Sequence, residues 1–187
     1  MITIAIDPGA NGGIARKDGD SVSCWPMPET LGDLADFLSG LKLFDQVQAV
    51  VEQTGGYMPG NSGPASVKFA RHCGQIEGLL QGFGIPYRQV APKTWQNGMG
   101  LPADKAERKR AIKAAMQARY PWLTVTLATA DALAILTWAL DGGKSTPSPA
   151  AKIASKASRM PGEAKTTQSA GRRTGKTAQG NVEGVKV

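Results

Sequence analysis

Three acidic residues stand where the surrounding sequence is apolar. Asp7 ends the run MITIAID, Glu52 follows QAVV, and Asp131 lies near the start of an apolar segment that continues to Leu140. Taken singly, each acid could be a helix cap or a turn residue. Together they suggest converging carboxylates, because a charge in apolar surroundings is costly unless it is compensated. With one histidine and two cysteines in the chain, the available ligands are oxygens, which favour Mg²⁺ or Mn²⁺.

The elements before Glu52 indicate how two of these acids meet. The run MITIAID and the runs on either side of the turn signal Asp18-Gly19 predict three short antiparallel strands. Apolar residues at helical spacing predict a helix from Glu29 to Leu41, which leads into the strand QAVVEQ. This crossover favours parallel pairing of the first and fourth strands. Since the carboxyl ends of adjacent parallel strands lie side by side, we expect Asp7 and Glu52 to be neighbours.

The rest of the body continues this alternation. The pattern predicts a long helix from about Pro64 to Phe83, a fifth strand in IPYRQVAP, a helix from Asp104 to about Tyr120, and a final helix from about Thr129 to Leu140. Asp104 and Glu107, three residues apart, form a plausible N-terminal cap. The order predicts a mixed α/β fold with one central sheet covered on both faces.

The long helix also carries a ridge of small residues at every fourth position: Ser66, Ala70, Gly74, Gly78 and Gly82. Glycine inside a helix costs about 1 kcal/mol relative to alanine, so such a ridge needs a compensating close approach by another element. Two interpretations stay open: tight packing on the protein's own sheet, and a seam between two copies in a homodimer.

Basic side chains gather near the start of the helix that follows Asp104. They are Lys105, Arg108, Lys109, Arg110 and Lys113. Cations near a helix N-terminus oppose the helix dipole, so stability alone does not favour this arrangement. We interpret them as phosphate contacts in preference to a solvated face. Lys93 is a further candidate, whereas Trp95 beside it is expected in the core.

Charge divides the chain into two parts. Residues 142–187 carry 9 basic and 2 acidic side chains, and residues 1–141 carry 13 of each, so the whole net charge of +7 belongs to the last part. We expect a single domain over 1–141 and a disordered basic tail over 142–187, which acts as a solubilising segment or as a tether to a polyanion. Since no stretch approaches the roughly 20 apolar residues of a membrane span and no secretory signal pattern is present, we expect a cytoplasmic protein.

Taken in order, these segments carry a family resemblance. The motifs are IDPG with GGIA, VVEQ, PGNS within GGYMPGNSGPASVKF, GQIEGLL, VAPKTWQNGMGL, DKAERKR and ADALAI. Over residues 2–140 the chain resembles small, phage-type members of the RuvC-type Holliday junction resolvases, in the ribonuclease H-like superfamily. The resemblance implies a five-stranded mixed sheet flanked by helices, a homodimer, a bacterial or phage origin, and nicking of four-way DNA junctions by two Mg²⁺ or Mn²⁺ ions.

The resemblance also assigns roles. Asp7 corresponds to the first-strand acid, Glu52 to the fourth-strand acid, and Asp131 to the second acid of the C-terminal helix; these would be the metal-binding, catalytic residues. The family usually has another ligating Asp or His where this chain has Ala128. Family members also place an aromatic side chain against unpaired bases, a role that Tyr57 could take.

Two alternatives remain beside the resolvase. A protein of the same fold could bind junctions or other DNA without cutting, which the alanine at position 128 and the basic tail would suit. A related nuclease could instead act on other branched DNA or on RNA–DNA hybrids, since the same acids would serve. A phosphotransferase of the actin-like ATPase class would need two such domains, and about 140 ordered residues supply only one.

Overall fold

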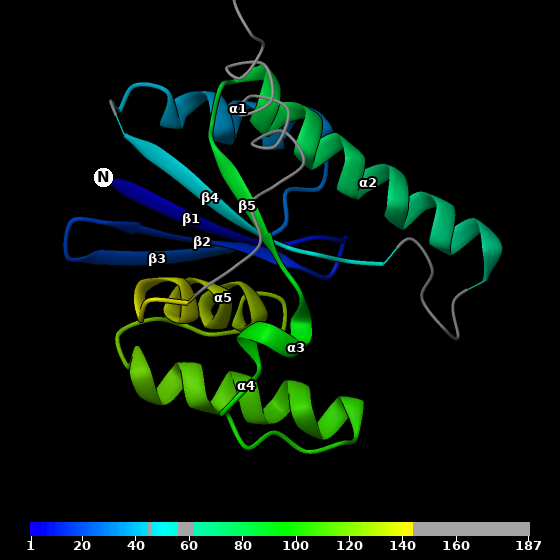
Figure 1. Cartoon of the computed structure of the whole chain (residues 1–187), viewed down its shortest axis with the longest axis vertical. Coiled ribbons are helices and arrows are strands. Elements are labelled where there is room, and N and C mark those ends of the chain that lie inside the picture. Colours follow the sequence, from blue (N-terminus) through cyan, green and yellow to red (C-terminus); the bar gives the residue numbers. More distant parts are fainter. Residues whose placement is uncertain (45, 56–61, 144–187) are drawn as a thin grey trace, which may run out of the picture.

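A computed structural model describes residues 1–44, 46–55 and 62–143, and these form a five-stranded mixed sheet between two layers of helices (Figure 1). The strands are β1 (Ile2–Asp7), β2 (Gly13–Asp18), β3 (Ser21–Pro26), β4 (Val47–Glu52) and β5 (Tyr87–Val90). Their order is β3-β2-β1-β4-β5. The β1–β2 and β2–β3 pairs are antiparallel, while β1–β4 and β4–β5 are parallel. The expected parallel pairing of the first and fourth strands is confirmed.

The helices divide between the two faces. They are α1 (Leu31–Leu41), α2 (Gly63–Gly82), α3 (Pro92–Trp95), α4 (Lys105–Arg119) and α5 (Ala130–Leu140). In Figure 1, α1 and α2 lie on one side of the sheet, and α3, α4 and α5 lie on the other. The sheet is therefore covered on both faces, as predicted. Helix α3, a single turn that Pro92 begins, was not predicted from the sequence.

The side-chain alternation of β1 and β4 explains both layers. Ile2, Ile4 and Ile6 enter the core under α1 and α2, whereas Ala5 enters the core under α5. Asp7 follows Ala5 by two residues, and Glu52 follows Val50 of the same α5-side core by two residues. Because successive strand residues alternate between faces, both acids belong to the face that α5 covers.

Local capping fixes where the longer helices begin. The Asp104 Oδ1 atom accepts hydrogen bonds from the backbone N–H groups of Ala106 and Glu107, each at 2.9 Å. Thr30 and Ser62 cap α1 and α2 in the same way. The predicted cap at Asp104 is confirmed, and it satisfies backbone donors that a helix start leaves without intrahelical partners.

The ridge of small residues on α2 does not pack on the protein's own sheet. A Cβ atom added at Gly74, Gly78 or Gly82 would meet no other described atom within 4 Å. Within α2, only Ile76 and Leu80 are fully buried, and the helix runs beyond the sheet in Figure 1. The packing interpretation is therefore wrong, and the homodimer seam remains as a prediction.

Two sequence-based expectations lie outside the described residues: the disordered basic tail, beyond Gly143, and the base-stacking role of Tyr57. Across the ranges that are described, no helix combines the length and apolar character that crossing a membrane would take.

Gly13 lies against the turn that leads into α5, and we expect Gly13→Ala to destabilise the protein by about 1–3 kcal/mol. A Cβ atom there would lie 2.6 Å from the Ala128 carbonyl oxygen and 2.8 Å from the Trp25 carbonyl oxygen, and backbone cannot move away cheaply. Gly40→Ala in α1 is the control, because its Cβ would enter open space and should stabilise the helix by about 0.5–1 kcal/mol. Urea unfolding measures both, and equal stability of the two variants would contradict the close approach.

Candidate active site

Asp7 and Glu52 end two adjacent parallel strands and lie next to each other on the sheet. Ile6 of β1 pairs with Val51 of β4, so the acid at the end of each strand takes the following position. Asp7 is 7% exposed. The two carboxyl groups are close enough that each affects the pKa of the other. The predicted neighbourhood of these two acids is thus present.

Asp131 reaches the same place from the layer above the sheet. It is the second residue of α5, which packs on β1 and β2. Gly13 of β2 lies opposite Asp7 and directly below the backbone of Ala128 and Thr129. Because glycine has no side chain to hold the helix away, the first turn of α5 carries Asp131 to the carboxyl edge of the sheet.

All three carboxyl groups have raised pKa values. Burial raises the pKa of Asp7 well above its ordinary value, and the charges of Glu52 and Asp131 raise it further. Burial likewise raises the pKa of Glu52 and of Asp131, and the Asp131 charge adds to the effect on Glu52. Three such groups held together in a poorly solvated place attract a proton or a cation.

Trp95 holds Glu52 in place. Its indole Nε1 donates a hydrogen bond to Glu52 Oε1 at 3.0 Å, which offsets part of the effect of burial on the Glu52 pKa. Trp95 is 2% exposed and belongs to the α5-side core, as the sequence predicted. The hydrogen bond was not predicted, and it gives the four-residue helix α3 a direct connection to the site.

Lys109 is the cation that lies closest to Asp131 among the ion pairs of the described residues. Its Nζ atom is 3.6 Å from Asp131 Oδ2, and the two side chains are 36% and 14% exposed. The Lys109 charge lowers the pKa of Asp131, and to a smaller extent those of Asp7 and Glu52. Asp131 Oδ1 is buried and has no hydrogen-bond partner among the described atoms.

The other predicted phosphate-binding residues border this site to different degrees. Arg108 is half-buried, donates to the Ala103 carbonyl at 3.2 Å, and its charge also lowers the pKa of Asp131. Lys105, Lys109 and Lys113 recur every four residues and therefore share one side of α4. Lys93 is exposed on α3, and Arg110 is exposed about 100° around the helix from Lys109.

The donor set suits a hard divalent cation. An orphaned, buried Asp131 oxygen and two adjacent strand-end carboxyls with raised pKa values are features of a site that attracts a cation. Asp7 and Glu52 would hold the ion. Within residues 1–44, 46–55 and 62–143, no three His, Cys, Asp or Glu side chains lie close enough together to bind one ion jointly.

Ala128, where the family usually has an acid or a histidine, lies in a turn stabilised by two threonines. Ala128 lies in a turn where the Thr126 and Thr129 hydroxyls are 3.2 Å apart, and the Thr126 backbone N–H donates to Thr129 Oγ1. This turn shapes the start of α5 with hydroxyl groups, which are weaker ligands for Mg²⁺ than carboxylates.

His72 lies outside the carboxylate cluster. It lines a cavity of about 510 Å³ between α2 and the loops after β1 and β3, together with Asn11 and Phe69. Burial lowers the pKa of His72, and its Nε2 atom has no hydrogen-bond partner among the described residues. No sequence pattern indicates this cavity, because its walls come from three separate segments.

Comparison with known proteins finds similarity in solved structures. No family model matches the chain, and no curated protein matches it. The structure of Thermus thermophilus RuvC is 18% identical, with a TM-score of 0.47 over 79% of this chain and 100% of that one. RuvC of the same organism in complex with its Holliday junction substrate is 18% identical, with a TM-score of 0.49 over 78% and 99%. Both are RuvC proteins, the family that the sequence resembles.

The strand order and directions settle the class of fold. A five-stranded mixed sheet in the order β3-β2-β1-β4-β5, flanked by helices on both faces, is the ribonuclease H-like fold that the resemblance implied. That expectation is confirmed.

Since the pKa of Asp7 is higher in the folded state than in the unfolded chain, its protonation favours folding, and this contribution is lost as pH rises from about 4 through the raised value. Asp7→Asn should therefore stabilise the metal-free protein at pH 7–8 by about 0.5–2 kcal/mol and have little effect at pH 4. Urea unfolding in EDTA over this pH range measures the difference. Asp36→Asn, on the exposed face of α1, is the control. A loss of stability in Asp7→Asn at neutral pH would contradict the repulsion.

Proposed function

We propose that this protein is a structure-selective endodeoxyribonuclease that resolves four-way DNA junctions by metal-dependent, paired hydrolysis of phosphodiesters. The observation that carries the proposal is the convergence of Asp7, Glu52 and Asp131, from three separate elements, in a buried cluster with raised pKa values. The junction as substrate is supported by the ordered motifs of the sequence, from IDPG to ADALAI.

The residues divide the chemical work among them. A divalent cation at Asp7 and Glu52 would supply Lewis-acid polarisation of the phosphodiester and a water of lowered pKa. Asp7 and Glu52 provide the negative charge that holds it, and Trp95 fixes the orientation of Glu52. Asp131 contributes the third negative charge and a buried oxygen that is free to accept a hydrogen bond. None of these roles needs a side chain to act as general base.

DNA would lie along the basic side of α4. Lys105 and Lys113 flank Lys109, which contacts Asp131, so the row of lysines runs past the carboxylates. Lys93 on α3 and Arg108 and Arg110 on α4 extend this basic surface. Phosphates that bind such a row would bring one strand to the cluster.

Two copies of the chain would be needed for paired nicks, because one carboxylate cluster cuts one strand. The open ridge of Gly74, Gly78 and Gly82 supports α2 as the seam of a homodimer, since small residues allow two helices to approach closely. Val67, 70% exposed on the same helix, adds apolar surface that a second copy would cover. We further assign residues 1–141 to the catalytic domain and 142–187 to a basic tether for DNA.

Cleavage of a labelled four-way junction, in comparison with matched linear duplex and RNA–DNA hybrid, tests the proposal. In Mg²⁺ or Mn²⁺ we expect paired nicks in the junction alone, and none in EDTA. Asp7→Asn should lower the cleavage rate by at least about 100-fold, because the cation site loses a ligand, while junction binding is retained. Tight binding without cleavage in either metal would favour a non-cutting protein of this fold, and cleavage of the hybrid would favour a different nuclease.

Charge reversal on α4 tests the proposed DNA path. Lys105→Glu with Lys113→Glu should weaken junction binding and lower the slope of log affinity against log salt by about 2, one for each lost phosphate contact. The control is Lys17→Glu with Lys42→Glu, because Lys17 pairs with Thr3 at the end of β1 away from Asp7 and Lys42 follows α1 on the other face of the sheet. Fluorescence anisotropy in EDTA at several salt concentrations measures both. An unchanged slope in the α4 variant would mean that these lysines are only solvated.

A further inference from the structure

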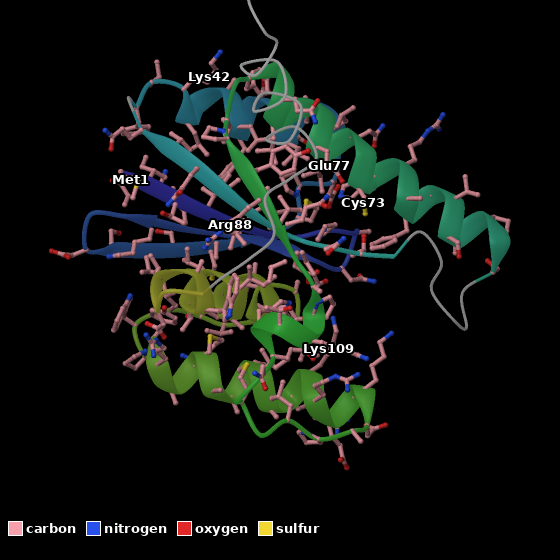
Figure 2. The ribbon with its side chains drawn as sticks, viewed as in Figure 1. Met1, Lys42, Cys73, Glu77, Arg88 and Lys109 are labelled. Atoms are coloured by element: carbon pink, nitrogen blue, oxygen red, sulfur yellow. The ribbon has the colours of Figure 1, made fainter. Side chains whose placement is uncertain are left out.

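Lys109 differs from the other lysines of α4 in what it contacts. Its ammonium lies 3.6 Å from Asp131 Oδ2, and the carboxylate that it faces is largely buried. In Figure 2, Lys109 lies on the side of α4 that faces the sheet. A lysine that served only to bind DNA backbone would extend into solvent, where its charge is fully hydrated. Lys109 instead brings a positive charge into the carboxylate cluster.

The cluster consequently falls into two halves. Asp7 and Glu52 end the adjacent parallel strands β1 and β4, and Asp131 has an ion pair with Lys109. This division agrees with the finding that, in the described parts of the chain, no three acidic, histidine or cysteine side chains could hold one ion together. Asp7 and Glu52 have no cation of their own among the described ion pairs, whereas Asp131 has the Lys109 ammonium.

A second divalent ion beside Asp131 would meet the Lys109 ammonium at close range. Two cations that share one carboxylate in a poorly solvated place repel each other strongly. The turn at Ala128 offers no further carboxylate that would compensate for this repulsion. A second divalent ion and the Lys109 ammonium therefore exclude each other beside Asp131, and Lys109 already occupies this position.

We propose that the Lys109 ammonium is the second cation of the catalytic site, so that the protein works with one divalent ion, at Asp7 and Glu52, plus one lysine. This inference rests on the proposed function. Asp131 positions Lys109, and Lys109 donates hydrogen bonds to a non-bridging oxygen of the scissile phosphate. It is thus a catalytic residue as well as part of the basic surface.

The lysine keeps its protons throughout the reaction. A water oxygen forms a bond to phosphorus, the bond from phosphorus to the 3′-oxygen breaks, and one proton of the water passes to the departing 3′-oxygen. Negative charge on the non-bridging oxygens grows in the transition state, and a fixed ammonium beside them stabilises that charge more than it stabilises the ground state.

The decisive measurement is calorimetric titration of the full chain with Mn²⁺ in the absence of DNA. The wild-type protein should bind one ion. Lys109→Gln should bind Mn²⁺ roughly 3–10-fold more tightly, because a competing positive charge is gone. Lys42→Gln, at the end of α1 on the opposite side of the sheet from α4 (Figure 2), is the control and should bind as the wild type does. Thermal unfolding verifies that each variant folds.

Cleavage kinetics supply the second readout. Under single turnover with saturating metal, Lys109→Gln should cut at least about 100-fold more slowly, as expected when a preorganised donor to the transition state is removed. Lys109→Arg, which retains the charge, should restore most of the rate. Junction affinity in EDTA should fall by no more than about threefold in Lys109→Gln, the loss expected for one phosphate contact near physiological salt.

The outcomes separate this inference from the function on which it rests. Unchanged Mn²⁺ affinity and stoichiometry in Lys109→Gln would overturn the inference even where the junction is cut. Cleavage by Lys109→Gln at the wild-type rate would overturn it as well. A wild-type protein that cuts nothing would refute the proposed function, and the titration would still decide whether Lys109 occupies the place of a cation.

Discussion

The mutual repulsion of three buried carboxylates is the constraint on which the rest of this structure depends. Asp7, Glu52 and Asp131 each have a raised pKa because burial disfavours the ionised form, and at Asp7 and Glu52 the negative charge of Asp131 disfavours it further. Such a cluster lowers stability unless something else in the fold overcomes the repulsion. Here the apolar cores on both sides of the sheet hold the acids together. The strand ends and the helix start cannot separate without exposing these cores.

The route by which the third acid arrives shows how small residues act in this arrangement. Ala5 and Ala15 lie on the sheet face below α5, and Gly13 lies below the turn that precedes it. A larger residue at Gly13 would meet the backbone of Ala128, and α5 would have to shift. The position of Asp131 therefore depends on Gly13, which has no side chain and lies on β2, two strands away from Glu52. The packing of α5 on the sheet thus also determines the arrangement of the acidic residues.

The sequence predicts the elements well where a periodic apolar pattern exists. The five strands, the helices α1, α2, α4 and α5, and the adjacency of Asp7 and Glu52 all follow from periodicity and from the crossover rule. Helix α3 was missed because one helical turn has no period to detect. The orientation of the small-residue ridge on α2 could not be chosen, since a packed ridge and an open ridge have the same spacing. Only the coordinates show that Gly78 faces open space.

The contact between Lys109 and Asp131 could not be predicted from the sequence. In the sequence Lys109 is one of six cations on α4, with the same helical spacing as Lys105 and Lys113. Its contact with Asp131 depends on how α4 packs against α5, which no local pattern encodes. Once that packing is known, the ordinary description of a basic DNA-binding helix no longer accounts for this residue. The Lys109 charge partly neutralises Asp131 and so reduces the repulsion that the fold must overcome, even when no metal ion is bound. The same ion pair that makes the cluster tolerable in the free protein places a positive charge where a phosphate would arrive.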